Sequence, residues 1–386
     1  MTDNLDKIRN TLSGLRGLGI IGVTDIVGSV ITALFWFYIA TLLGAEQYGH
    51  VAYFLSIGSI VSTVSLLGST NTLSVYLPKN VRLESTVYLI SIIIGFVAFV
   101  VLFFLFSDIS LGAYVVGTIF VGLASSEIIA ARHYNSYPKY LIISKILMIG
   151  LSIGLYYLIG VSGIILGLGL SLFPYLIRIY QGFKNSKIDF SLLKPRTEFL
   201  INSFILNLSS AFKGSIDKLI IAPLVGFTLL GNYQFSVQFL SVMTMLPIIV
   251  FKYLLPQDAR GIPNKKLKMY VILLSIIITS LGIILTPVII TNFFPEYAKT
   301  VEIIQIFSVS IIPFTISVVL ISEFIGNENA RIVLFGSGIF IGIIILSIIL
   351  LGKAFGMNGI ATSMVLADSS EATFYFIVKR MQTRKT

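Results

Sequence analysis

Long apolar runs separated by short polar breaks constrain this chain more than any other feature of its sequence. A helix needs about 20 apolar residues to cross the hydrocarbon core of a bilayer. Apolar side chains make up 56% of the 386 residues and charged ones only 11%, whereas soluble domains average about 25% charged residues. The sequence therefore predicts an all-α polytopic membrane protein. Twelve predicted spans lie near residues 17–42, 49–77, 86–106, 110–131, 140–159, 162–183, 199–226, 230–256, 268–291, 299–322, 332–352 and 357–378.

Basic residues are unevenly distributed between the loops. With a cytoplasmic N-terminus, only Lys299 and Lys353 fall outside, and Lys213 and Lys218 fall within a span. The other 23 of the 27 lysines and arginines fall on the inside or at inner helix ends, as the positive-inside rule requires. Both termini are therefore predicted to be cytoplasmic. Because the net charge of +10 follows this topology, it does not indicate nucleic-acid binding.

The sequence divides into two similar halves. Residues 41–54 read TLLGAEQYGHVAYF and residues 223–236 read PLVGFTLLGNYQFS, so that Gly44 aligns with Gly226 and Gly49 with Gly231. Glycines permit tight turns with positive φ. We predict an N-terminal six-helix bundle (1–183), a cytoplasmic linker (184–198) and a C-terminal six-helix bundle (199–386). An even number of spans in each half implies a pseudo-twofold axis along the membrane normal.

Pairs of glycines four residues apart occur within two of the spans. They are Gly163 with Gly167 and Gly338 with Gly342. Small residues at this spacing let helices approach closely in membranes. We therefore expect both pairs to serve helix packing.

Residues 199–226 form the only predicted span with three charges close to its middle, namely Lys213, Asp217 and Lys218. A charge at mid-membrane costs about 2.5–3.5 kcal/mol on insertion scales, so these side chains must face protein or water. Lys213 and Asp217 share a helix face and can partly neutralise each other. Lys218 then remains as an unpaired cation. Two interpretations stay open: a buried ion-pair network that fixes packing, and a cationic lining for an anionic substrate.

Further charged residues lie in or beside other spans. Asp368 and Glu371 are three residues apart in the last span, where they could bind protons or pair with Lys213 or Lys218. Asp25, in the first span, is either interfacial or a lining residue. Arg178, near the end of the sixth span, could reach substrate phosphates at the cytoplasmic mouth or extend to the interface.

Several classes of function find no support in the sequence. There is no cysteine, so disulfides, thiolate nucleophiles and Cys-ligated metals are excluded. Neither His50 nor His133 has metal-ligand spacing, and no nucleotide-binding glycine motif is present. Outside loops are too short for the catalytic groups of a polysaccharide polymerase or ligase. We predict a protein that is not an enzyme and needs no cofactor.

Two segments carry a resemblance to a known family. They are FYIATLLGAEQYGHVAYFLSI (37–57) and SIDKLIIAPLVGFTLLGNYQFSVQF (215–239). Together they resemble the Wzx-like polysaccharide flippases, whose superfamily also holds the lipid II flippases and the MATE multidrug exporters. The resemblance implies a MATE-like fold with a central cationic cavity lined by the first and seventh helices.

The resemblance also implies a function. The protein would transfer an oligosaccharide, linked through phosphate or pyrophosphate to a polyprenyl or dolichyl lipid, by alternating access. The transfer would cross the cytoplasmic membrane of a prokaryote. It would serve cell-surface polysaccharide biosynthesis, alongside polysaccharide assembly enzymes.

Lys213, Asp217 and Lys218 match the family's seventh-helix position. There the two lysines, together with Arg178, would bind the substrate phosphates. Asp25 lies in the first helix, where some exporters place a coupling acidic residue. One departure is that the first helix has no basic residue beyond Arg16. The alternative is a MATE-like antiporter of organic cations, which requires an acidic lining.

Overall fold

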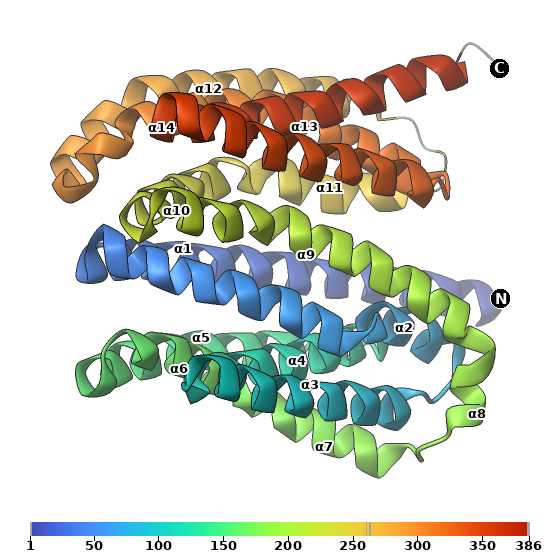
Figure 1. The fold of residues 1–386 in the computed structure, drawn as a ribbon. Coiled ribbons are helices and arrows are strands. Elements are labelled where there is room, and N and C mark those ends of the chain that lie inside the picture. Colours follow the sequence, from blue (N-terminus) through green and yellow to red (C-terminus); the bar gives the residue numbers. More distant parts are fainter. Residues whose placement is uncertain (1, 260, 262–263, 384–386) are drawn as a thin grey trace. The chain divides into compact units, whose positions relative to one another are not determined.

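The structure is a computed structural model that describes residues 2–259, 261 and 264–383, and these residues form helices and no strand (Figure 1). The α-helices are α1 (Thr2–Leu66), α2 (Ser69–Tyr76), α3 (Glu84–Phe106), α4 (Ile109–Ala130), α5 (Ser136–Ile159), α6 (Val161–Leu170), α7 (Leu176–Asn185), α8 (Phe190–Leu193), α9 (Thr197–Val225), α10 (Phe227–Met243), α11 (Met245–Asp258), α12 (Lys265–Phe293), α13 (Val301–Gly326) and α14 (Ala330–Thr383). Short 3₁₀ helices are η1 (Leu77–Lys79), η2 (Phe173–Tyr175), η3 (Lys194–Arg196) and η4 (Pro295–Thr300). The predicted all-α class is confirmed.

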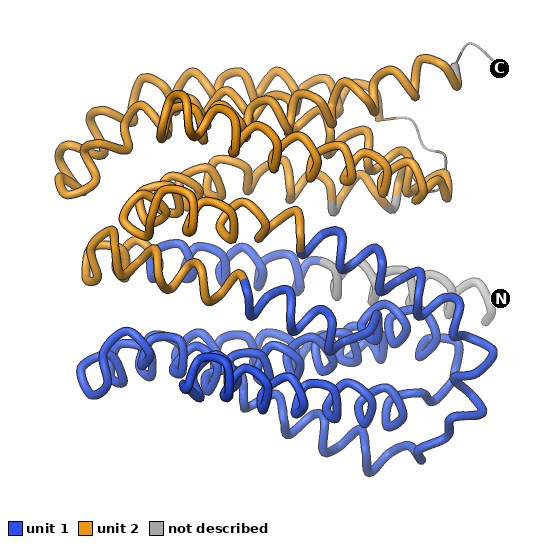
Figure 2. Tube along the Cα trace, in the orientation of Figure 1, with its two compact units in different colours: residues 1–35, 57–211 blue, residues 36–56, 212–386 orange. Residues whose placement is uncertain are grey.

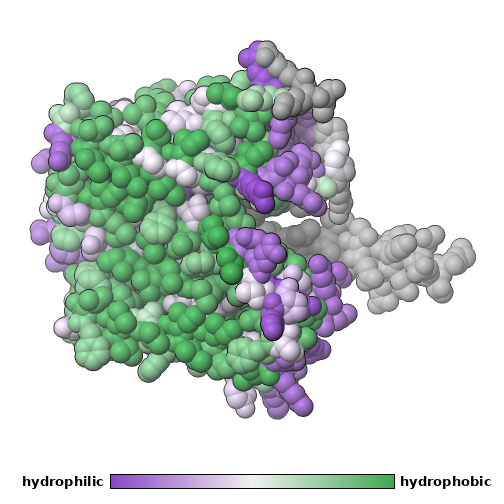
Figure 3. All heavy atoms as spheres, turned by 45° about the vertical axis from the view of Figure 1, so that its right-hand side comes forward, coloured by the Kyte–Doolittle hydropathy of each residue, from purple (hydrophilic) through white to green (hydrophobic). Residues whose placement is uncertain are grey.

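Eight helices in the described part of the chain are long and apolar enough to span a bilayer, or nine if the bent pair α10 and α11 forms one span. Two of them, α1 and α14, are longer than a bilayer requires, and each contains one non-helical glycine, Gly44 or Gly356. Helix α9 is not among these candidate spans. Twelve spans and two cytoplasmic termini therefore remain predictions. Apolar residues cover most of the face in Figure 3, and hydrophilic ones gather along its edge.

The chain divides into two compact units, coloured in Figure 2. Unit 1 comprises Met1–Phe35 and Ile57–Ala211, and unit 2 comprises Trp36–Ser56 and Phe212–Thr386. The unit boundaries therefore lie within α1 and α9, not in the predicted linker. The predicted bundles, 1–183 and 199–386, describe the sequence repeat and have other bounds than these two units, so they remain a prediction.

Backbone contacts at glycines hold the segment 36–56 within unit 2. A Cβ on Gly49 would lie 2.0 Å from the carbonyl oxygen of Phe227, and a Cβ on Gly231 would lie 1.7 Å from that of Ala45. Only glycine permits such a close approach of two backbones. Tyr297 adds a hydrogen bond from its hydroxyl to the Ala40 carbonyl at 2.8 Å.

A second close approach packs the first part of α9 onto α2 within unit 1. A Cβ on Gly68 would lie 2.5 Å from the carbonyl oxygen of Leu200. Beyond it, the Asn71 amide donates to Asn207 Oδ1 at 3.2 Å, and the Asn207 amide donates to the Thr70 hydroxyl at 3.3 Å. Both glycine contacts thus join helices that are distant in the sequence.

The aligned glycines adopt matching conformations, as the sequence repeat predicts. Gly44 has φ 71° and ψ 171°, and Gly226, 182 residues later, has φ 87° and ψ 168°. Both glycines break a helix in the positive-φ half of the φ/ψ map, which glycine tolerates and other residues avoid. The expected positive φ is confirmed at Gly44 and Gly226. It is wrong at Gly49 and Gly231, which lie within helices and are needed for close backbone contact.

A further structural repeat, with an offset of 196 residues, was not predicted from the sequence. Gly160 has φ 70° and ψ −147°, and Gly356 has φ 58° and ψ −133°. Three residues later, a Cβ on Gly163 would lie 2.2 Å from the Leu155 carbonyl oxygen, and one on Gly359 would lie 2.0 Å from that of Leu351. Leu155 and Leu351 are themselves 196 residues apart. The same glycine turn therefore joins α5 to α6 and the first part of α14 to its second part.

The same offset relates the ends of α4 and α13. Arg132 and Glu328, 196 residues apart, both have positive φ, 58° and 61°. The next amide in each case closes the helix by bonding a carbonyl five residues back (His133 N to Ile128 O at 2.9 Å, and Asn329 N to Phe324 O at 2.8 Å). A non-glycine residue with positive φ costs free energy. Because such a residue occurs at both helix ends, we infer that both copies retain one ancestral turn.

The two predicted glycine pairs differ in their packing. A Cβ on Gly167 would lie 2.4 Å from the Ser152 amide nitrogen, so the Gly163–Gly167 pair packs backbone against backbone as predicted. Around Gly338 and Gly342 no atom lies within 4 Å of the Cβ position. The packing prediction is wrong for that pair, because spacing alone does not place a neighbouring helix on that face.

Replacing Gly231 with alanine should destabilise the protein, since the added Cβ would overlap the Ala45 carbonyl. We expect Gly231→Ala to lower the free energy of unfolding by about 1–3 kcal/mol, measured by thermal unfolding in detergent. Gly338→Ala is the matched control. It should leave stability unchanged or raise it by up to about 1 kcal/mol. Equal effects of the two substitutions would contradict the packing described.

Single cysteines can test the predicted topology, because the chain has none of its own. We expect Lys353→Cys to react with a membrane-impermeant maleimide in intact cells. Lys187→Cys, in the predicted cytoplasmic linker, should react only after permeabilisation. Labelling of Lys187→Cys in intact cells would show that the orientation is inverted.

Candidate functional site

Asp217 and Lys218 form a buried ion pair on α9, with exposed fractions of 5% and 9%. The Lys218 ammonium lies 3.1 Å from Asp217 Oδ1 and also donates to the Gly214 carbonyl at 2.8 Å. From α10, the Tyr233 hydroxyl donates to Asp217 Oδ2 at 2.7 Å. The predicted partner of Asp217 was Lys213, and this pairing is wrong. The flexible lysine stem folds back along the helix, so the adjacent residue reaches the carboxylate.

Lys213 pairs with Glu371 of α14 instead. Its ammonium lies 2.5 Å from Glu371 Oε2 and 4.4 Å from the ring centroid of Phe340. The Tyr375 hydroxyl donates to the other carboxylate oxygen at 3.2 Å. The Glu371 side chain is fully buried, whereas 23% of the Lys213 side chain is exposed. Of the two open interpretations of Glu371, the structure shows the ion pair.

Asp368 completes this group of charges, which we call the α9 cluster: Lys213, Asp217, Lys218, Asp368 and Glu371. Asp368 is 3% exposed. Its charge interacts with those of Lys213 and Glu371, and Ser310 of α13 lies beside it. The cluster thus contains two lysines and three carboxyl groups, all within unit 2. The expectation of one unpaired cation is wrong, because Glu371 pairs with Lys213 and Asp217 pairs with Lys218.

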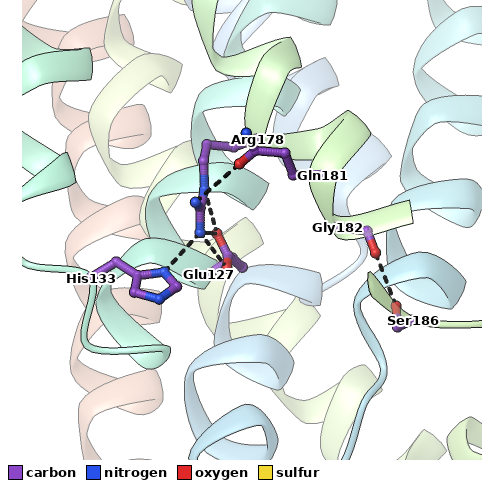
Figure 4. Close-up of polar contacts among 6 residues, drawn as sticks. All are labelled: Glu127, His133, Arg178, Gln181, Gly182 and Ser186. Carbon is purple, nitrogen blue, oxygen red and sulfur yellow. Dashed lines mark hydrogen bonds and ion pairs between the residues drawn. The ribbon is translucent and has the colours of Figure 1, made fainter. Parts of the chain in front are cut away.

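Arg178 of α7 binds Glu127 of α4 within unit 1 (Figure 4). Its Nε donates to Glu127 Oε2 at 3.0 Å, and its Nη2 donates to Oε1 at 2.7 Å. Nη1 bonds Gln181 at 3.1 Å, and Nη2 also lies 2.9 Å from His133 Nδ1. The guanidinium is therefore engaged by protein groups in this structure. A phosphate would have to compete with a two-pronged carboxylate contact, which is among the stronger side-chain interactions.

Asp25 is half-buried on α1 in unit 1. The Tyr137 hydroxyl of α5 donates to its Oδ1 at 2.8 Å. Asp25 and Arg178 thus belong to one unit and the α9 cluster to the other. The candidate residues do not form one continuous site within either unit.

A second buried ion network in unit 2 was missed by the sequence analysis. The Lys268 ammonium lies 2.7 Å from Asp258 and 2.8 Å from Glu323, and Lys379 lies 2.5 Å from Glu323. Lys268 is only 8% exposed. One signal could have found the network: Glu323 stands 196 residues after Glu127, so both copies of this helix end carry a glutamate that binds a basic residue.

No cluster for a metal ion is present among the residues the structure describes, where no three His, Asp or Glu side chains converge in a suitable group.

Comparison with known proteins was made for sequence and for structure. No family model and no curated protein sequence matches the chain. Among solved structures, the lipid II flippase MurJ in an inward closed conformation matches with a TM-score of 0.76 at 15% identity, over 92% of this chain and 87% of that one. An inward-facing multidrug resistance MATE family transporter of the MOP superfamily matches at 0.69 and 13%, over 92% and 94%. An outward-facing one matches at 0.64 and 14%, over 95% of both chains.

This chain has the MATE/MurJ-like fold. Because the matches cover nearly the whole chain, the predicted fold class is confirmed for the chain as a whole. With identities of 13–15%, the likeness is one of fold, and it carries no residue role from those proteins to this one. The solved structures with this fold reported above are transporters and a flippase.

Removing one partner of the Lys213–Glu371 pair should cost more than removing both. Lys213→Met leaves a fully buried carboxylate without its cation, which should lower the free energy of unfolding by about 3 kcal/mol, the lower end of the range for a broken buried pair. Adding Glu371→Gln should recover most of that loss. Thermal unfolding in detergent measures both variants. Lys353→Met, in an exposed position, is the control, and additive losses in the double variant would contradict the pairing.

Proposed function

We propose that the protein is a flippase that moves a lipid-linked oligosaccharide, attached through a phosphate or pyrophosphate, across the membrane by alternating access. The MATE/MurJ-like fold supports a membrane transporter of the MOP superfamily. The resemblance of residues 37–57 and 215–239 to the Wzx-like flippases supports the substrate class. On this proposal the carrier is a polyprenyl or dolichyl lipid, the membrane is that of a prokaryote, and polysaccharide assembly enzymes supply and use the substrate.

The proposal rests on the partial exposure of the Lys213 side chain. Lys213 is the more exposed lysine of the α9 cluster, with 23% of its side chain accessible against 11% for Lys218. Its partner Glu371 is fully buried and fixed by Tyr375. An anion approaching the cluster therefore meets the ammonium and not the carboxylate. A pyrophosphate offers more than one negative charge, so it can compete with a single carboxylate for this lysine.

Exchange of partners links substrate binding to proton binding. When Lys213 turns to a phosphate, Glu371 is left buried without a cation, which is costly unless the carboxylate gains a proton or another partner. Asp368, which is buried in the same cluster, likewise needs a cation or a proton. In this proposal the substrate phosphate and a proton therefore bind to the α9 cluster together, the phosphate at Lys213 and the proton at a neighbouring carboxyl group.

A second candidate, a MATE-like antiporter of organic cations, rests on a different observation. The α9 cluster holds three carboxyl groups and two lysines, so one carboxylate exceeds the number of cations when all are ionised. Such an excess favours a cationic ligand at Asp368 over an anionic one at Lys213. The two candidates thus predict opposite charges for the transported molecule.

Leaflet transfer in proteoliposomes tests the proposal. The substrate is a fluorescent polyprenyl-pyrophosphate sugar lipid, and an impermeant quencher reports the label in the outer leaflet. We expect transfer by the wild type and its loss in Lys213→Ala with Lys218→Ala. Lys213→Gln with Glu371→Gln is the matched variant, because it removes the cation without stranding a buried carboxylate. It should stay folded and also lose transfer.

Other outcomes would reassign the cluster. Normal transfer by both variants would make the lysines packing residues, and the phosphate-binding role would be wrong. Absence of transfer in the wild type, together with proton-driven export of a cationic dye that Asp368→Asn abolishes, would establish the antiporter instead.

A further inference from the structure

Residues 184–196, which are the last two residues of α7 and the segment that joins α7 to α9, are attached to the start of α3. The Ser85 hydroxyl donates to the Ser186 carbonyl at 2.8 Å, and the Asp189 amide donates to the Thr86 hydroxyl at 2.8 Å. Within the segment, the Ser186 hydroxyl also donates to the Gly182 carbonyl (Figure 4). We call this segment the inner strap. Its backbone is held at several points, so its side chains have defined positions on unit 1.

Positive charge dominates the inner strap and the neighbouring residues 77–83. Together they carry six basic residues and one acidic residue, Asp189. The Asp189 carboxylate is used locally, because it accepts from the Ser191 amide at 2.8 Å at the start of α8. No ion pair joins any of the six to a carboxylate in the described part of the chain. The six are Lys79, Arg82, Lys184, Lys187, Lys194 and Arg196.

Two of these cations converge on one aromatic ring. The Lys79 ammonium lies 5.5 Å from the ring centroid of Tyr76, and the Arg196 guanidinium carbon lies 5.0 Å from it. Phe199 packs against the same ring, with centroids 5.3 Å apart. The buried Nε of Arg196 has no hydrogen-bond partner among the described residues. Two cations thus lie near one ring, and the Arg196 guanidinium, whose Nη1 donates to the Leu192 carbonyl, keeps an unsatisfied N–H. This combination favours a bound anion.

Apolar side chains lie exposed among these charges. Ile188 and Phe190 of the inner strap are 49% and 56% exposed. The exposed apolar face of α7 leads to them, with Ile177 at 56% and Tyr180 at 70%. A polar segment with basic residues and exposed apolar side chains is typical of chain that lies in a membrane interface, where the apolar groups enter the acyl boundary. A soluble phosphate compound would gain nothing from Ile188 and Phe190.

We propose that the inner strap and residues 77–83 form a binding surface for the phosphates of anionic phospholipids. Lys79 and Arg196 hold a headgroup phosphate beside Tyr76, Ile188 and Phe190 enter the leaflet next to it, and the remaining cations attract further anionic lipid. This surface belongs to unit 1 and shares no residue with the α9 cluster, so it binds membrane lipid whatever molecule is transported.

Lipid retention tests the proposal. The full chain is purified in mild detergent, incubated with equal amounts of phosphatidylglycerol and phosphatidylcholine, and the bound lipids are counted by native mass spectrometry. We expect phosphatidylglycerol to be retained preferentially. A basic residue near an anionic surface contributes about fivefold in affinity, so Lys79→Gln with Arg196→Gln should weaken retention by about twentyfold. Lys299→Gln with Lys353→Gln, which removes the same charge elsewhere, should not change it.

Two further arms separate the possible explanations. Lys184→Gln, Lys187→Gln and Lys194→Gln together act only on exposed positions, so they should weaken retention even if the Arg196 variant does not fold. Ile188→Ser with Phe190→Ser should weaken retention of the lipid but not binding of soluble glycerophosphate. Equal retention of both lipids by the wild type, or unchanged retention in the charge variants, would overturn the proposal. Full displacement of the lipid by equimolar glycerophosphate would overturn the lipid as its ligand.

Discussion

A charge inside an apolar span must have a partner, and much of unit 2 is arranged around this requirement. Removing one side of a buried ion pair costs about 3–5 kcal/mol, which is a large fraction of the stability of a typical domain. Lys213 and Glu371 therefore connect α9 to α14, and Tyr233 connects Asp217 to α10. Lys268 connects the start of α12 to the ends of α11 and α13. Each pair fixes which helices are neighbours, in an environment where apolar contact alone does not distinguish one helix from another.

Glycine provides the second constraint. Close approach at Gly49, Gly231 and Gly68 brings backbones nearer than any other residue permits. At these points packing replaces charge as the source of specificity. The positive φ of Gly44 and Gly226 then ends one helix and begins the next within a single residue. Ion pairs fix the identity of neighbouring helices, and glycines fix how closely they approach.

The sequence predicted the helical class and the turns at Gly44 and Gly226, because hydrophobic length and positive φ are local properties, and the MATE-like fold came from the family resemblance. For the buried charges the sequence offered Glu371 as one alternative partner of Lys213, but it placed Asp217 opposite Lys213 and left Lys218 unpaired. Lys213 and Asp217 have the spacing of a helical pair, yet their partners come from 158 residues away and from the next residue in the chain. Gly338 and Gly342 have the spacing of a packing motif, yet no neighbouring atom of the described residues comes within 4 Å of their Cβ positions. The partners of the charges and the packing of the glycine pair both depend on which helices are neighbours in the fold. A single sequence does not reveal these neighbours.

The contact between the two copies of the glycine motif has a consequence for the origin of the protein. Gly231 meets Ala45, and Gly49 meets Phe227, and Phe227 is the residue that corresponds to Ala45 at an offset of 182. The contact is therefore reciprocal, as in the isologous interface of a twofold dimer. A single ancestral repeat could have made the same contact with a second copy of itself. Gene fusion would then have turned a subunit interface into an intramolecular one, after which its two sides were free to diverge, as alanine and phenylalanine now show.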